Sequence, residues 1–136
     1  MSILYDVTVQ AGDDIRKGIE SYAMEQGWES AAILGAVGSV QELVFTTPVE
    51  NQLPLRTMAT PCHGAAEILS FTGEVMKREL MDPALEAVYP DKERPFFVHI
   101  HASCATAGGH VYGGGLSGGR AFRALRIFLM PLGRQK

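Results

Sequence analysis

The segment Phe96–Leu116 places the tightest constraint on how this chain can fold. Its first half, FFVHIHASC, has the two-residue period that is typical of a strand. Since alternate side chains leave a strand on opposite faces, we predict that His99 and His101 share one face. Two glycine clusters follow, 108–109 and 113–115, and glycine in a strand often marks a bulge or a close approach. The pattern therefore predicts a hairpin that builds the functional site.

The length and charge of the chain limit the classes of function. The 136 residues are a typical size for one domain, so we expect a single domain over residues 1–136. The formal net charge of −3 argues against the basic surface that most nucleic-acid-binding domains carry. Five basic residues do cluster late in the chain, which leaves room for a local basic patch. We expect DNA binding to be weak.

The expected cellular location of the protein follows from two features that the sequence does not show, a signal peptide and a membrane span. The first residues are acidic and hold no long apolar run, so they do not resemble a signal peptide. No stretch approaches the roughly 20 apolar residues that a membrane span needs. We therefore expect no membrane partner, a cytoplasmic protein, and reduced thiols at Cys62 and Cys104.

The periodicity of the remaining chain predicts one long helix among several short strands. Asp13 or Asp14 can cap a helix whose apolar stripe begins at Ile15, and Gly27 can end it. Asp82-Pro83 indicates a further helical segment of one or two turns. Strands or extended pieces are expected at residues 4–9, 30–37, 40–47, 55–59, 65–76, 110–112 and 121–130. The fold class is therefore α+β, with a mainly antiparallel sheet, one long helix and one or two short helical segments.

Two details of this assignment bear on the site. The stretch 30–37 is small and apolar almost throughout, which is typical of a strand buried on both faces, and Gly35 and Gly38 are expected to bracket a turn after it. Strict alternation places Cys104 on the face opposite His99 and His101, where a small buried residue is the common role. We find no complete catalytic constellation and predict no catalytic residue.

A zinc ion is one candidate ligand of the two histidines. Zinc needs three or four ligands, and His99 with His101 supplies two. The third would come from His63, His110 or Glu67. The alternative is that both histidines are hydrogen-bonded polar residues on a half-buried face.

The late glycines are a second candidate site. Gly113, Gly114 and Gly115 could bind a ligand through backbone amides, although the run lacks a phosphate-binding fingerprint. Tight turns and close packing between subunits explain these glycines equally well.

Four ordered segments of this chain resemble the PPC domain (plants and prokaryotes conserved, also called DUF296). The segments are GDDI before the helix, GAVGSV, EILSFTG, and HIHAS leading to VYGG. The resemblance implies a compact α+β fold that assembles as a homotrimer. It also implies kinship with proteins described as DNA-binding, which in plants carry an AT-hook before this domain. Some members hold a metal with His-x-His and a later histidine in a GGHL motif.

The sequence departs from this family pattern in three places. No AT-hook core, Arg-Gly-Arg-Pro, occurs in the chain, and the turn between the hairpin strands is Ala-Gly-Gly instead of a charged one. The GGHL motif reads Gly-Gly-Gly-Leu, so Gly115 stands where the third histidine is expected.

Two functional hypotheses therefore follow. The first is a non-enzymatic PPC-type regulator that acts as a homotrimer and binds DNA or another macromolecule. The alternative is a small-ligand or metal-binding protein, including an uncharacterised enzyme, that uses the His99/His101 strand.

Overall fold

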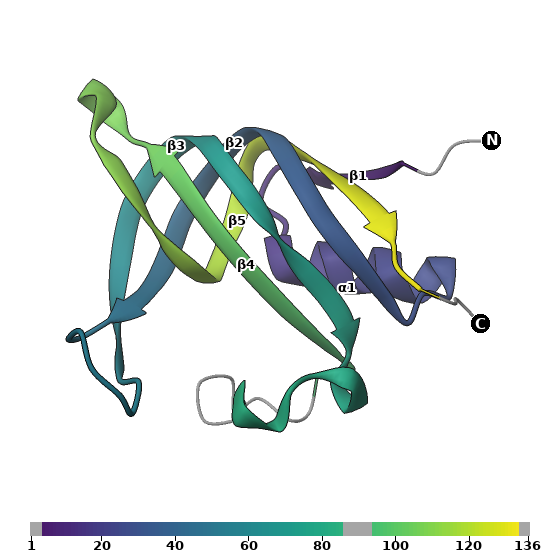
Figure 1. Cartoon of the computed structure of the whole chain (residues 1–136). Helices are drawn as coiled ribbons and strands as arrows, with labels where there is room; N and C mark the ends of the chain where they lie inside the picture. Colours follow the sequence, from purple (N-terminus) through teal and green to yellow (C-terminus); the bar gives the residue numbers. More distant parts are fainter. Residues whose placement is uncertain (1–3, 86–93, 134–136) are drawn as a thin grey trace.

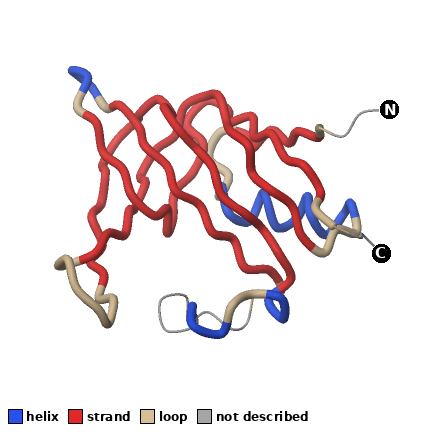
Figure 2. Tube along the Cα trace, in the orientation of Figure 1, coloured by secondary structure: helices blue, strands red, loops and turns tan. Residues whose placement is uncertain are grey.

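The computed structural model describes residues 4–85 and 94–133. In chain order its elements are β1 (Tyr5–Gln10), α1 (Ile15–Gln26), β2 (Ser30–Pro48), β3 (Thr57–Lys77), the short 3-10 segments η1 (Arg78–Leu80) and η2 (Pro83–Leu85), β4 (Phe96–Ala105), η3 (Ala107–Gly109) and β5 (Val111–Pro131). The expected α+β class with an antiparallel sheet and one long helix is confirmed, and Figure 2 shows how far strands dominate.

The five strands form one strongly curved sheet. Their order is β1-β5-β2-β3-β4, and the first residues of β5 pair with β4 as well. This second pairing closes β2, β3, β4 and β5 into a ring, because β5 is long enough to pair with β4 at one end and with β2 along the rest. Figure 1 shows the resulting curve, with α1 lying along the sheet near β1.

Helix α1 forms where its sequence predicts it. The carboxylate of Asp14 accepts a hydrogen bond from the backbone N–H of Lys17 at 2.9 Å, which caps the first turn. Gly27 ends the helix in the left-handed region, at φ 71°. Between these ends, Ile15 and Ile19 are buried in the core and hold the helix against the sheet.

The strands are longer than the sequence predicts. The segments 30–37 and 40–47 were expected as two strands around a turn, but β2 is continuous from Ser30 to Pro48. Gly38 lies inside it at φ 141°, and an ideal Cβ there would come within 2.1 Å of the Ala124 carbonyl oxygen of β5. The glycine therefore allows two backbones to approach and bends the strand, where we predicted a turn.

Two other pairs of predicted segments also merge. The extended piece 55–59 and the strand 65–76 both belong to β3, and the pieces 110–112 and 121–130 both belong to β5. The prediction that these were separate strands was wrong because it took glycine and proline as residues that end a strand. In a curved sheet they occur within strands, as Pro61 does in its pairing with Val44.

The strand predicted to be buried on both faces has one exposed face in this chain. Ala31 and Ile33 are buried, whereas Leu34 and Val37 of the same strand are exposed. These two apolar side chains therefore lie on a face of the sheet that the described residues leave exposed.

The short helical segment expected at Asp82-Pro83 is present as η2. The carboxylate of Asp82 accepts a hydrogen bond from the backbone N–H of Ala84 at 3.0 Å. The remainder of that prediction, around residues 86–89, lies outside the described residues. No helix in the described ranges is long and apolar enough to span a membrane.

Candidate ligand-binding site

Strand β4 sends the two histidines to the face opposite the core, as the alternation predicts. Val98, Ile100 and Ala102 are buried, while His99 is half-buried and His101 is exposed. The two imidazole rings lie edge to face, with centroids 5.0 Å apart and an interplanar angle of 83°. The prediction of a shared face is therefore confirmed.

The neighbouring strands decide what surrounds these rings. On one side β3 places Glu74 opposite His99 and Thr72 opposite His101. On the other side β5 places Gly115 opposite His101. Because glycine has no side chain, the face of His101 toward β5 is left open.

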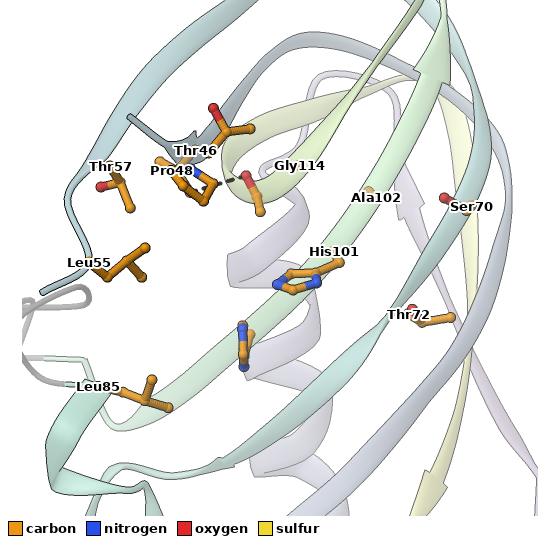
Figure 3. A pocket seen from close by; sticks show the side chains of 13 residues that line it. Thr46, Pro48, Leu55, Thr57, Ser70, Thr72, Leu85, His101, Ala102 and Gly114 are labelled. Atoms are coloured by element: carbon orange, nitrogen blue, oxygen red, sulfur yellow. Dashed lines mark hydrogen bonds between the residues drawn. The ribbon is translucent and has the colours of Figure 1, made fainter. Parts of the chain in front are cut away.

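A pocket of about 540 Å³ lies over this open face. Figure 3 shows His101 beside it, with Leu55 and Leu85 on the far side. The described residues that line the pocket come from six segments of the chain: Thr46, Thr47, Pro48, Leu55, Thr57, Ser70, Thr72, Leu85, His99, His101, Ala102, Gly114 and Gly115. Its size is in the range of small-molecule sites.

Among residues 4–85 and 94–133, no lysine, arginine, aspartate or glutamate lines the pocket, and His99 and His101 are the ionisable side chains of this lining. Burial lowers the pKa of His99, and the neighbouring His101 lowers it further, while Glu74 has a smaller opposing effect. The imidazole of His99 is therefore held in its neutral form at neutral pH.

The predicted third zinc ligands lie elsewhere. His63 contacts the carboxylate of Glu42 at 3.3 Å on an exposed part of β3. Glu67 lines a separate surface pocket with Arg123, and His110 follows the β4–β5 turn. None of His63, His110 and Glu67 lines the pocket beside His99 and His101.

The described residues do not provide a complete metal site. Within residues 4–85 and 94–133 there is no group of three or more His, Cys, Asp or Glu side chains that could hold a metal ion. Two imidazoles alone do not meet the three or four ligands of a zinc site. Zinc binding thus stays a prediction.

Two of the three glycines predicted as ligand-binding residues line the pocket. Gly114 and Gly115 line it, whereas Gly113 lies opposite Ser103 and does not. The lining residues of β2, the β2–β3 connection and η2 were not predicted. No local pattern marks Thr46, Leu55 or Leu85, because only the folded sheet brings them to the histidines.

The two cysteines form a contact that the sequence did not predict. Cys62 and Cys104 are buried free thiols whose Sγ atoms lie 3.7 Å apart. Burial, and the hydrogen bond with Cys62, raise the pKa of Cys104 to about 11. Neither thiol lines the pocket, so the expected role of Cys104 as a small buried residue is confirmed.

Several arginines are engaged with acids or backbone carbonyls. Arg56 pairs with Glu50 and Arg94 with Glu20. The guanidinium of Arg126 donates to Asp6 at 2.7 Å. Arg16 donates to backbone carbonyl oxygens of Val98 and Ser117. These contacts reduce the positive charge available for a phosphate backbone.

The family model for the Plants and Prokaryotes Conserved (PCC) domain matches residues 3–133. The chain belongs to the PCC family. The family resemblance predicted from the four sequence segments is thereby confirmed. Among curated proteins none matches this PCC chain.

Solved structures of PCC-type proteins share the fold. A PPC protein from Pyrococcus horikoshii is 22% identical, with a TM-score of 0.74 over 98% of this chain and 82% of its own. A metal-containing protein from Archaeoglobus fulgidus is 27% identical, with a TM-score of 0.75 and the same coverages. A "putative DNA-binding protein" from Bacteroides thetaiotaomicron is 16% identical, with a TM-score of 0.76 over 99% and 82% of the two chains.

Proposed function

We propose that this PCC chain is a non-enzymatic regulatory protein that acts as a homotrimer and binds a small molecule in the pocket beside His99 and His101. The pocket carries the proposal. It combines the volume of a small-molecule site with a lining that joins apolar side chains to imidazoles and hydroxyl groups.

The lining favours binding over catalysis. Its described residues include imidazoles and hydroxyls, but no carboxylate and no thiol. A general base with an orienting partner, or an activated nucleophile, is what a hydrolytic mechanism would need. The His63–Glu42 pair has such a partner, but it is exposed and lies outside the pocket.

The proposed binding is tested by screening a library of small organic fragments against the full chain. Binding is followed by NMR signals of the histidine side chains. We expect a subset of fragments to shift the signals of His99 and His101 together. Replacing Thr57, which lines the pocket, with tryptophan should abolish these shifts, while Thr8→Trp on β1 should preserve them. Fragments that shift neither histidine would contradict the proposal.

DNA binding is a second candidate, favoured by the names of two structural relatives. The Bacteroides thetaiotaomicron protein and one from Ralstonia eutropha are both named "putative DNA-binding". The negative net charge and the paired arginines argue that any such binding is weak in this chain.

Metal binding is supported by one relative. The Archaeoglobus fulgidus protein is named metal-containing, and this chain keeps the His-x-His pair of the motif. With Gly115 in place of a third histidine, we propose that zinc binds here only weakly.

The proposed homotrimer rests on the family and on an exposed apolar surface. Ile33 pairs with Gly73 and Ser39 with Glu67, and between these two pairs Val37 of β2 and Leu69 of β3 lie on neighbouring strands. These two side chains are 66% and 56% exposed. Adjacent exposed apolar side chains on a sheet are typical of a face that a second subunit covers.

A further inference from the structure

The pocket beside His99 and His101 has two chemically distinct sides. Pro48, Leu55 and Leu85 contribute apolar surface from the end of β2, the β2–β3 connection and η2, although the neighbouring threonines 46, 47 and 57 add hydroxyl groups there. The two imidazoles and Thr72 contribute polar groups from the sheet. Figure 3 shows Leu55 and Leu85 across the pocket from His101. A ligand that satisfies both sides must itself have an apolar body and a polar end.

The lining within residues 4–85 and 94–133 holds no lysine, arginine, aspartate or glutamate, and this restricts the charge of that ligand. A charged group that leaves water must be paired, or its burial is strongly unfavourable. The nearest acid on the adjoining strand is Glu74, opposite His99. It lines an adjoining hollow of about 200 Å³, which shares Thr72, His99 and His101 with the larger pocket, but it does not line the larger pocket itself. Within the larger pocket, the described lining therefore offers no fixed counter-charge to carboxylates, phosphates or ammonium groups.

The polar side can both donate and accept hydrogen bonds. A neutral imidazole has one donor and one acceptor nitrogen, and a threonine hydroxyl has both capacities. Within the described part of the chain, the ring of His101 contacts the ring of His99 and has no hydrogen-bond partner. An amide or hydroxyl head group matches these groups, because it also donates and accepts.

We propose that this pocket takes an uncharged small molecule with an amide or hydroxyl head group and a compact apolar body. The inference rests on the proposed binding function and specifies its ligand class. The head group lies against His101 and Thr72, and the apolar body lies against Pro48, Leu55 and Leu85. The same arrangement selects against charged molecules of equal shape.

Three naphthalene compounds of nearly equal shape test the ligand class on the full chain. They are 2-naphthamide, 2-naphthoate and 2-naphthylmethylammonium, and the measurement is made at about pH 8, where an ordinary imidazole is uncharged. Affinity is measured by calorimetry, and the position of binding by histidine side-chain NMR. We expect the amide to bind at least tenfold more tightly than either charged compound and to shift His99 and His101.

A charge placed in the lining provides the matched variant. Thr72 is exposed and lies opposite His101, so Thr72→Asp adds a carboxylate to the polar side without filling core space. We expect this variant to reverse the preference, with the ammonium compound binding more tightly than the amide. Thr8→Asp on β1, an exposed threonine outside the lining, should keep the wild-type order.

The outcomes separate the ligand class from the binding function. If the naphthoate or the ammonium compound binds the wild-type chain as tightly as the amide while shifting His99 and His101, the ligand class is wrong and the binding function stands. If the amide leaves both histidines unshifted while library fragments shift them, the ligand class is again wrong. If neither the three compounds nor the library shifts them, the binding function fails too.

Discussion

Gly115 lies directly opposite His101 where β5 pairs with β4. An ideal Cβ on Gly115 would lie 4.0 Å from Cδ2 of the His101 ring, so a side chain at this position would be directed at the histidine pair. The same Cβ would lie 2.9 Å from Oγ1 of Thr46, which must turn or shift to make room.

We predict that Gly115→His creates a stronger zinc site. The wild-type chain offers two imidazoles, which make an open and weak site, and the variant adds a third ligand from the facing strand. Calorimetric titration with zinc alone should show a gain in affinity of at least tenfold for the variant.

The control for this variant is Gly118→His, further along β5. An ideal Cβ on Gly118 meets no atom within 4 Å, and this residue pairs with Val44 instead of a histidine. Its zinc affinity should equal that of the wild-type chain. Tight stoichiometric zinc in the wild-type chain, or no gain in Gly115→His, would contradict the prediction.

The oligomeric state gives a second prediction. Light scattering at micromolar concentration should return the mass of a trimer. Leu69→Asp should shift the population toward monomers, because it places a charge on the apolar surface shared with Val37. Met24→Asp, at an exposed apolar position on α1, is the control and should remain trimeric. A monomeric wild-type chain would refute the homotrimer.

DNA binding gives a third prediction. In a mobility-shift assay at physiological salt, binding should be weak or undetectable, and any complex should dissociate as salt rises, since few phosphates can be neutralised. An Asp6→Asn variant releases Arg126 from its ion pair and should bind DNA slightly more tightly. Nanomolar, sequence-selective binding by the wild-type chain would show this prediction wrong.

The buried thiol of Cys104 gives a fourth prediction, on stability at high pH. Its pKa is raised to about 11 in the folded chain, whereas an unfolded cysteine titrates near about 8.5. Between these values the folded state keeps a proton that the unfolded state loses, so unfolding is favoured as pH rises. We expect a loss of about 2 kcal/mol in the free energy of unfolding from about pH 9 to pH 11.

Denaturant unfolding at a series of pH values measures this loss. Cys104→Ala should lower stability at neutral pH and remove this part of the slope, so that its stability approaches that of the wild-type chain as pH rises. Cys62→Ala should keep most of the slope, because burial is the main cause of the shift and the contact with Cys62 is second. An unchanged slope in Cys104→Ala would assign the effect to other groups.

Local patterns in the sequence determined the elements that depend on near neighbours. Helix α1 begins after Asp14 and ends at Gly27 because capping and the left-handed glycine act within one turn. The two-residue period of β4 determined that His99 and His101 share the face opposite the core. The ends of the helix and the shared face of the histidines can therefore be predicted without knowing which strands pair.

The lengths of the strands were decided by tertiary structure. Gly38 occurs within a strand because the backbone of β5 passes too close for a Cβ, and a single sequence does not show that approach. A period of two residues reports burial of alternate positions in a strand, and it fails where bulges shift the register, as between Gly38 and Val40.

The pocket was likewise decided by pairing across the sheet. Gly115 reaches His101 only through the β4–β5 register, and Leu55 and Leu85 reach the same space from connections far away in the sequence. The contact between Cys62 and Cys104 has the same origin, since 42 positions separate the two residues. The sequence by itself determined which side chains β4 presents, and only the closure of the sheet decided which partners face them, because strand register is a long-range property of the fold.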